Sequence, residues 1–174
     1  MPFDTKALSQ RFAATRILVV DDEHYMRKVV RTMLMSLGVR DILEAADGPT
    51  GLELIRRSAP DVVILDWEMP GLDGASFVRM VRSPDTFPYP DLPIIMLTGH
   101  GECSRVVEAV QIGVNEFLLK PVSSKALQDR LISVLTNPRP LIRTRGYYGP
   151  APRRTVAAIH ADNDETLASV FMVN

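Results

Sequence analysis

Four polar clusters in this 174-residue chain each come directly after a short apolar run. They are Asp21-Asp22-Glu23 after 17–20, Asp66 after 62–65, Thr98 after 93–97 and Lys120-Pro121 after 117–119. Short apolar runs bounded by turn residues are typical of buried strands. If these strands are parallel, their carboxyl ends meet at one edge of a sheet, and the four clusters lie close together there.

Carboxylates, a hydroxyl and an ammonium group at one edge are suited to phosphoryl transfer. Three close carboxylates repel one another and need a cation in order to stay ionised, and oxygen ligands of this kind suit Mg²⁺. Lys120 and Thr98 can neutralise and orient the oxygens of a phosphoryl group. Because a carboxylate can also be the nucleophile that forms an acyl phosphate, the pattern predicts phosphoryl transfer onto Asp66.

Each of these residues also has an ordinary structural explanation when it is taken alone. Asp21 and Asp22 can cap the helix that follows them, and Asp66 can end a solvated strand. Thr98 can lie in a turn, and Lys120 can be a surface charge. The agreement of all four positions with the ends of successive strands favours a common site.

The rest of the sequence supplies the elements that must position these side chains. Strands are predicted at 16–20, 42–45, 62–66, 93–97 and 116–119, and helices at 25–37, 49–58, 73–82, 104–112 and 124–135. Five strand–helix units with apolar strands predict a doubly wound α/β fold, in which helices cover both faces of a five-stranded parallel sheet. Residues 1–14 are expected to form a short polar lead-in.

The composition is that of an ordinary globular protein and argues against several function classes. The 20 basic and 21 acidic residues leave a formal charge of −1, so no general attraction to nucleic acid or to an anionic membrane is expected. The apolar runs are far shorter than the roughly 20 residues of a membrane span. The single Cys103 excludes an internal disulfide, and residues 1–6 lack the apolar stretch of a secretion signal. We therefore expect a cytoplasmic protein.

The motifs resemble those of receiver domains in two-component response regulators over about 15–136. The matching segments are 17–23 (Ile-Leu-Val-Val-Asp-Asp-Glu), 66–74 (Asp-Trp-Glu-Met-Pro-Gly-Leu-Asp-Gly), Leu97-Thr98 and 117–121 (Phe-Leu-Leu-Lys-Pro). The tract 21–38 is particularly similar to single-domain chemotaxis response regulators. The resemblance implies a flavodoxin-like sheet with the strand order 2-1-3-4-5.

The resemblance also implies a role for each acidic residue. Asp66 would accept a phosphoryl group from a phosphohistidine on a sensor histidine kinase or a histidine phosphotransfer protein. Mg²⁺ would be held by Asp21, Asp22, Asp66 and the backbone carbonyl of Glu68. The protein would then be a signalling phosphoacceptor in a phosphorelay rather than an enzyme with an external substrate.

The same resemblance implies a conformational switch. Lys120 would pair with the phosphoryl oxygens, and its peptide bond to Pro121 would be cis. Thr98 would move to hydrogen-bond the phosphoryl group, and the aromatic residue Phe117 would follow it inward. Output would be protein contact through the surface of the fourth helix, fifth strand and fifth helix.

Four residues at the expected site call for separate comment. Phe117 stands where tyrosine or histidine is frequent in the family, which excludes a switch that depends on a ring hydroxyl. Glu68 adds negative charge two residues after the acceptor. His100 is better explained as a solvated loop residue than as a catalytic one. Trp67, the only tryptophan, is expected to be half-buried beside the site and to report Mg²⁺ binding by fluorescence.

The segment 137–174 has a different character. Residues 137–154 include four prolines and five arginines, so this stretch is predicted to be extended and irregular. It is too short for a winged helix, and the arginines are better explained as a solvated linker than as a nucleic-acid patch. Leu167, Val170 and Phe171 share one face of a possible short helix. The segment could pack on the receiver or on a second copy, or it could be a disordered end.

Three function classes follow from these observations. The favoured one is a stand-alone receiver that controls protein–protein contacts. The second is a Mg²⁺-dependent phosphohydrolase that forms an aspartyl phosphate with an external substrate, although Glu68 occupies the place where one such superfamily has an aspartate. The third is a receiver-like scaffold protein that is not phosphorylated. The sequence leaves open whether phosphorylation makes the protein dimerise.

Overall fold

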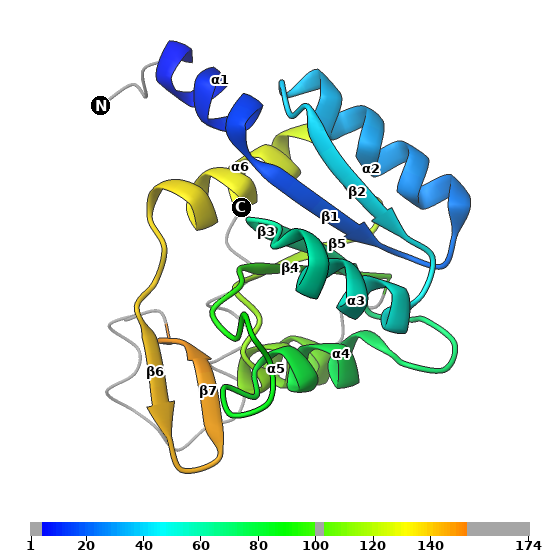
Figure 1. Cartoon of the computed structure of the whole chain (residues 1–174). Coiled ribbons are helices and arrows are strands. Elements are labelled where there is room, and N and C mark those ends of the chain that lie inside the picture. Colours follow the sequence, from blue (N-terminus) through cyan, green and yellow to red (C-terminus); the bar gives the residue numbers. More distant parts are fainter. Residues whose placement is uncertain (1–4, 100–102, 153–174) are drawn as a thin grey trace.

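The computed structural model describes residues 5–99 and 103–152, and its centre is a parallel five-stranded sheet (Figure 1). The strand order is β2-β1-β3-β4-β5, which confirms the predicted topology. The strands are β1 (Arg16–Val20), β2 (Asp41–Ala45), β3 (Val62–Asp66), β4 (Ile94–Thr98) and β5 (Glu116–Leu119). Because every neighbouring pair in this sheet is parallel, all five carboxyl ends face the same way.

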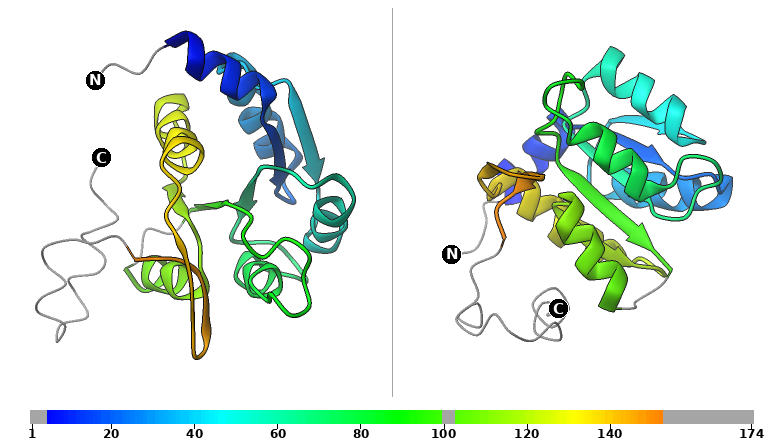
Figure 2. Two further views of the ribbon diagram at one scale, coloured as in Figure 1. Left: turned by 60° about the vertical axis from the view of Figure 1, so that its left-hand side comes forward. Right: turned by 90° about the horizontal axis from the view of Figure 1, so that it is seen from below.

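Helices cover both faces of the sheet, as Figure 2 shows from two further directions. They are α1 (Thr5–Ala14), α2 (His24–Ser36), α3 (Gly48–Ser58), α4 (Gly74–Val81), α5 (Cys103–Ile112) and α6 (Ser124–Thr136). Buried residues of α3, α4 and α5 pack on one face, and buried residues of α1, α2 and α6 pack on the other. Within the described ranges, no helix is long and apolar enough to cross a membrane.

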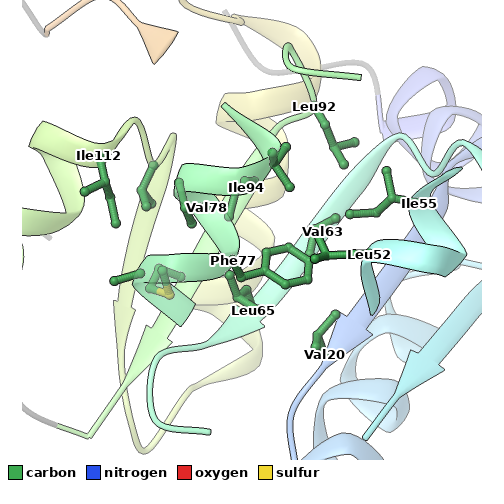
Figure 3. Packing of buried hydrophobic residues seen from close by; sticks show 14 of the residues in the cluster. Val20, Leu52, Ile55, Val63, Leu65, Phe77, Val78, Leu92, Ile94 and Ile112 are labelled. Carbon is green, nitrogen blue, oxygen red and sulfur yellow. The ribbon is translucent and has the colours of Figure 1, made fainter. Parts of the chain in front are cut away.

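Alternation along the strands divides the core into these two layers. In β3, Val63 and Leu65 contact the α3–α4–α5 layer, whereas Val62 and Ile64 contact the opposite layer. Figure 3 shows the ring of Phe77 from α4 beside Leu65 and close to Leu52 of α3. All five residues of β3 are buried, so this strand is the rigid centre from which Asp66 projects.

The loop between β3 and α4 is held close to the end of the sheet. The Asp73 side chain accepts a hydrogen bond from the Ser76 backbone nitrogen at 2.8 Å, which confirms the predicted helix cap. The next residue must be glycine, because a Cβ at Gly74 would lie 2.5 Å from the backbone oxygen of Asp66. This close approach fixes the start of α4 directly beside Asp66.

The amino-terminal segment differs from the polar lead-in that the sequence predicted. Residues 5–14 form the helix α1, so the described part of the chain has six helices where five were expected. Phe12 is only 1% exposed, and the partly buried Leu8, one turn earlier, packs against the same apolar cluster. The helix forms because these two side chains, four residues apart, share one face that is covered by the rest of the protein.

The segment after α6 also departs from the expected irregular conformation. Strands β6 (Leu141–Thr144) and β7 (Tyr147–Pro150) form an antiparallel hairpin, which lies beside α5 in Figure 1. The turn contains Gly146, whose φ of +90° is readily adopted only by glycine. The predicted helical stripe of Leu167, Val170 and Phe171 lies outside the described residues.

Candidate functional site

Asp66 ends the central strand β3 at the edge of the sheet. Its residue is 3% exposed, and the Lys120 ammonium lies 2.9 Å from its Oδ1 atom. Burial raises the pKa of the Asp66 carboxyl to about 6, and the charge of Asp21 acts in the same direction, against the hydrogen bond from Lys120. Asp66 is therefore a buried carboxylate that is mostly ionised only near neutral pH.

Asp21 and Asp22 follow β1 directly. Asp21 is 1% exposed, and its Oδ1 accepts a hydrogen bond from the Glu23 backbone nitrogen at 2.8 Å. Asp22 is exposed. The Arg27 guanidinium of α2 donates to the backbone oxygens of Asp21 and Asp22 at 2.7 and 3.2 Å, so it fixes the loop without neutralising either carboxylate directly.

The three aspartates come together as the sequence predicted. One carboxylate oxygen from each of Asp21, Asp22 and Asp66 lies within 4.8 Å of the others. Two of these residues are buried and one is exposed, which leaves the group open to solvent on one side. Hard oxygen ligands with access for water fit a divalent cation such as Mg²⁺.

Lys120 follows β5 and connects two of the aspartates. Its Nζ atom lies 2.9 Å from Asp66 Oδ1 and 3.3 Å from Asp21 Oδ2. Burial alone would lower the pKa of Lys120, but the hydrogen bond and charge of Asp66, together with Asp21, raise it. The peptide bond between Lys120 and Pro121 is cis, as the resemblance implied.

The two residues assigned to the switch lie on neighbouring strands. Thr98 at the end of β4 is fully buried, and its backbone oxygen accepts a hydrogen bond from the Lys120 backbone nitrogen at 2.8 Å. Phe117 on β5 is half-buried and packs against the α3–α4–α5 layer. The structure therefore brings Thr98 and Lys120 together through the backbone, and Phe117 lies on β5, the strand that Lys120 follows.

A contact that sequence reasoning missed connects the Asp66 loop to α5. Arg105 of α5 lies 3.5 Å from a carboxylate oxygen of Glu68, and its guanidinium carbon is 5.4 Å from the centre of the Trp67 ring. Trp67 is buried rather than half-buried, because its ring packs in the apolar cluster while Arg105 lies over it. No local pattern indicates this contact, since Arg105 lies 37 positions after Glu68.

The structure brings together most, but not all, of the residues that the sequence assigned to the site. Asp21, Asp22, Asp66 and Lys120 form one cluster, and Thr98 is joined to it through the backbone of Lys120. The Glu68 side chain is exposed and paired with Arg105, and the role of its backbone carbonyl stays a prediction. His100 lies outside the described residues.

Comparison with known proteins finds response regulator receivers. A family model for the response regulator receiver domain matches residues 17–132. The chain is 34% identical over 116 residues to the chemotaxis protein CheY-3 of Vibrio cholerae, covering 67% of this chain and 88% of that protein. It is 38% identical over 121 residues to CheY1 of Helicobacter pylori, covering 69% of this chain and 96% of that protein.

The solved structures similar to this chain include chemotaxis response regulators. CheY4 of Vibrio cholerae, crystallised at low pH, has a TM-score of 0.64 and 32% identity, covering 70% of this chain and 98% of that chain. A chain of the CheX–CheY–BeF₃–Mg²⁺ complex from Borrelia burgdorferi has a TM-score of 0.63 and 26% identity, covering 69% of this chain and 88% of that chain. The family match ends before β6 begins.

Proposed function

Because this chain belongs to the response regulator receiver family, we propose that it acts as the phosphoacceptor in a two-component phosphorelay. Asp66 accepts a phosphoryl group from a phosphohistidine, on a sensor histidine kinase or a histidine phosphotransfer protein. The observation that carries the proposal is the cluster at the carboxyl end of the sheet, where Lys120 lies 2.9 Å from Asp66 beside Asp21 and Asp22.

The chemistry follows from the charges in this cluster. An Asp66 oxygen attacks phosphorus, the phosphorus–nitrogen bond breaks, and its electron pair returns to the imidazole, leaving an aspartyl phosphate. Lys120 is placed to neutralise the phosphoryl oxygens as charge develops on them. Asp21, Asp22 and Asp66, with the Glu68 carbonyl, would hold Mg²⁺, which supplies further neutralisation of that charge.

We propose that output depends on Thr98 and Phe117. The Thr98 hydroxyl moves to hydrogen-bond the phosphoryl oxygens, and Phe117 follows it inward. These bonds form only in the phosphorylated protein, so they shift the population toward the conformation in which Thr98 and Phe117 have moved inward. Because α1 precedes the predicted elements, the output surface of the family corresponds here to α5, β5 and α6, and a downstream protein would bind there.

The functional unit that we propose includes both extensions. Phe12 of α1 is part of the apolar core, and Gly149 and Pro150 of β7 are buried. A unit of residues 5–152 is therefore better supported than the predicted boundaries at 15 and 136.

The proposal is tested by incubating the purified protein with Mg²⁺ and acetyl phosphate, followed by intact mass spectrometry. We expect the mass gain of one phosphoryl group, located on Asp66. Asp66→Asn should abolish it, whereas the matched control Asp129→Asn, an exposed residue of α6, should not.

The other function classes give different results in the same assay. Undiminished labelling of Asp66→Asn would contradict the assignment of the acceptor. Repeated turnover of a phosphomonoester would support a phosphohydrolase, and the absence of labelling in every variant would support a scaffold.

A further inference from the structure

A cleft lies at the amino end of the sheet, the end opposite to Asp66. It is an open cleft of about 520 Å³ between the β6–β7 hairpin and the ends of α4 and α5. Small-molecule sites typically have volumes of roughly 300–1,000 Å³. Figures 1 and 2 show the hairpin beside α5, where β7 contacts that helix.

The hairpin is attached to the receiver tightly enough to preform this cleft. Arg139 donates to the backbone oxygen of Asn115, and the Tyr148 hydroxyl donates to Asp91. Gly113 at the end of α5 has a φ of +96°, and a Cβ there would lie 2.9 Å from the Tyr148 backbone oxygen. The backbones of α5 and β7 therefore meet directly, and one wall of the cleft is fixed relative to the other.

Arg82, at the end of α4, borders the cleft and is 5% exposed. Its guanidinium donates to the backbone oxygens of Pro90, Leu92 and Gly113 and to the side-chain oxygen of Asn115, at 2.6–2.9 Å. All four acceptors are neutral, and burial lowers the pKa of Arg82 to about 10, which still leaves it charged at neutral pH. No carboxylate bonds this buried positive charge directly, although the charge of Asp91 raises the pKa of Arg82, so an anion nearby is favoured.

Two further arginines, Arg79 and Arg143, line the same cleft, and each is in an exposed ion pair. Arg79 pairs with Glu108 and Arg143 pairs with Asp85, each at 3.0 Å. The side chains of these two arginines are 55% and 63% exposed. Exposed pairs of this kind contribute little stability, so either guanidinium can exchange its carboxylate for a ligand at small cost.

β7 contributes two aromatic residues to the lining, Tyr147 and Tyr148. Guanidinium groups match the geometry of phosphate oxygens, and tyrosine rings pack against planar rings. We propose that this cleft binds a small phosphorylated ligand with a planar ring, of the size of a nucleoside monophosphate. Its phosphate contacts Arg79 and Arg143 near the fixed charge of Arg82, and its ring packs on the tyrosines.

The test is a titration of the ¹⁵N-labelled full chain with adenosine or guanosine monophosphate, without Mg²⁺ or a phosphoryl donor. At least one of them should cause saturable shifts of the amide signals of Arg143, Gly146 and Tyr148. Arg143→Gln should weaken this binding by about tenfold or more, because a charge-assisted hydrogen bond is lost. Arg31→Gln is the matched control, since Arg31 is also exposed and also pairs with a carboxylate, Glu44, at 2.9 Å, but it lies on α2.

Two simpler compounds separate the contributions to binding. Ribose 5-phosphate lacks the planar ring and adenosine lacks the phosphate, so each should bind more weakly than the nucleotide. The proposal is overturned if neither nucleotide gives saturable shifts at millimolar concentration, if either simpler compound binds as tightly, or if Arg143→Gln and Arg31→Gln behave alike. The titration should give the same result in Asp66→Asn, which keeps this test independent of the proposed phosphoryl transfer.

Discussion

At the carboxyl end of the sheet three aspartates gather beside one lysine, whereas at the amino end one buried arginine is held by four neutral oxygens. The first cluster has excess negative charge and an exposed member, Asp22, so a cation would reduce the repulsion among its carboxylates. The second has excess positive charge but fixed hydrogen-bond geometry. The carboxyl end is therefore suited to a change of charge, whereas Arg82 at the amino end holds the loops that precede β4 and β5.

The largest effect on stability is expected at the amino end. Arg82→Met removes four hydrogen bonds and leaves their acceptors, including the backbone oxygens of Leu92 and Gly113, without this partner. We expect the free energy of unfolding to fall by about 3 kcal/mol or more, measured by urea denaturation. Arg79→Met, which removes only an exposed pair, should cost less than about 1 kcal/mol. If the two variants lost similar amounts of unfolding free energy, Arg82 would not be the anchor that its hydrogen bonds indicate.

A truncation tests whether the two ends are independent. A chain that ends at Asn137 lacks the hairpin, and we expect its free energy of unfolding to be lower by about 2 kcal/mol because packing against α5 is lost. Its rate of phosphorylation by acetyl phosphate should be unchanged. A chain that ends at Pro152 is the control, since it keeps the hairpin. Slower phosphorylation of the shorter chain alone would show that the two ends are coupled.

Burial of the Asp66 carboxyl, together with the charge of Asp21, should make stability depend on pH. Because the pKa of Asp66 is raised to about 6 in the folded protein, ionisation destabilises the fold as the pH rises from about 4 to about 6. Without Mg²⁺, Asp66→Asn should therefore be more stable than the parent at pH 7 by about 1–2 kcal/mol, a value reduced by solvent screening. The difference should vanish below about pH 4, near the ordinary pKa of an aspartate. Urea denaturation at several pH values checks this, and an equal difference at every pH would contradict it.

The smallest effect is expected for the contact between α5 and the Asp66 loop. Arg105→Gln removes the exposed pair with Glu68 and the cation above Trp67, so stability should change by less than about 1 kcal/mol. The emission of Trp67 should nevertheless change, because Arg105 lies over its ring. Arg79→Gln, on α4, is a control that should leave the emission as it is.

Most of the receiver fold and its acidic cluster could be predicted from the sequence. Asp66 and Lys120 lie 54 positions apart, yet each directly follows an apolar strand. In a parallel sheet such positions meet at one edge, so strand prediction alone places them together. The helix α4 was equally predictable, because its cap is formed by Asp73, next to its first residue.

The sequence by itself determined those features whose causes are local: strand ends, helix caps and the alternation of apolar residues. Only the tertiary structure decided that α1 is a helix, that the hairpin lies on α5, and that Arg105 covers Trp67. Phe12 and Gly149 lie in polar segments of the sequence, and both are buried because distant elements cover them. Their burial depends on surfaces formed by other parts of the chain, and no local periodicity records which surfaces will meet.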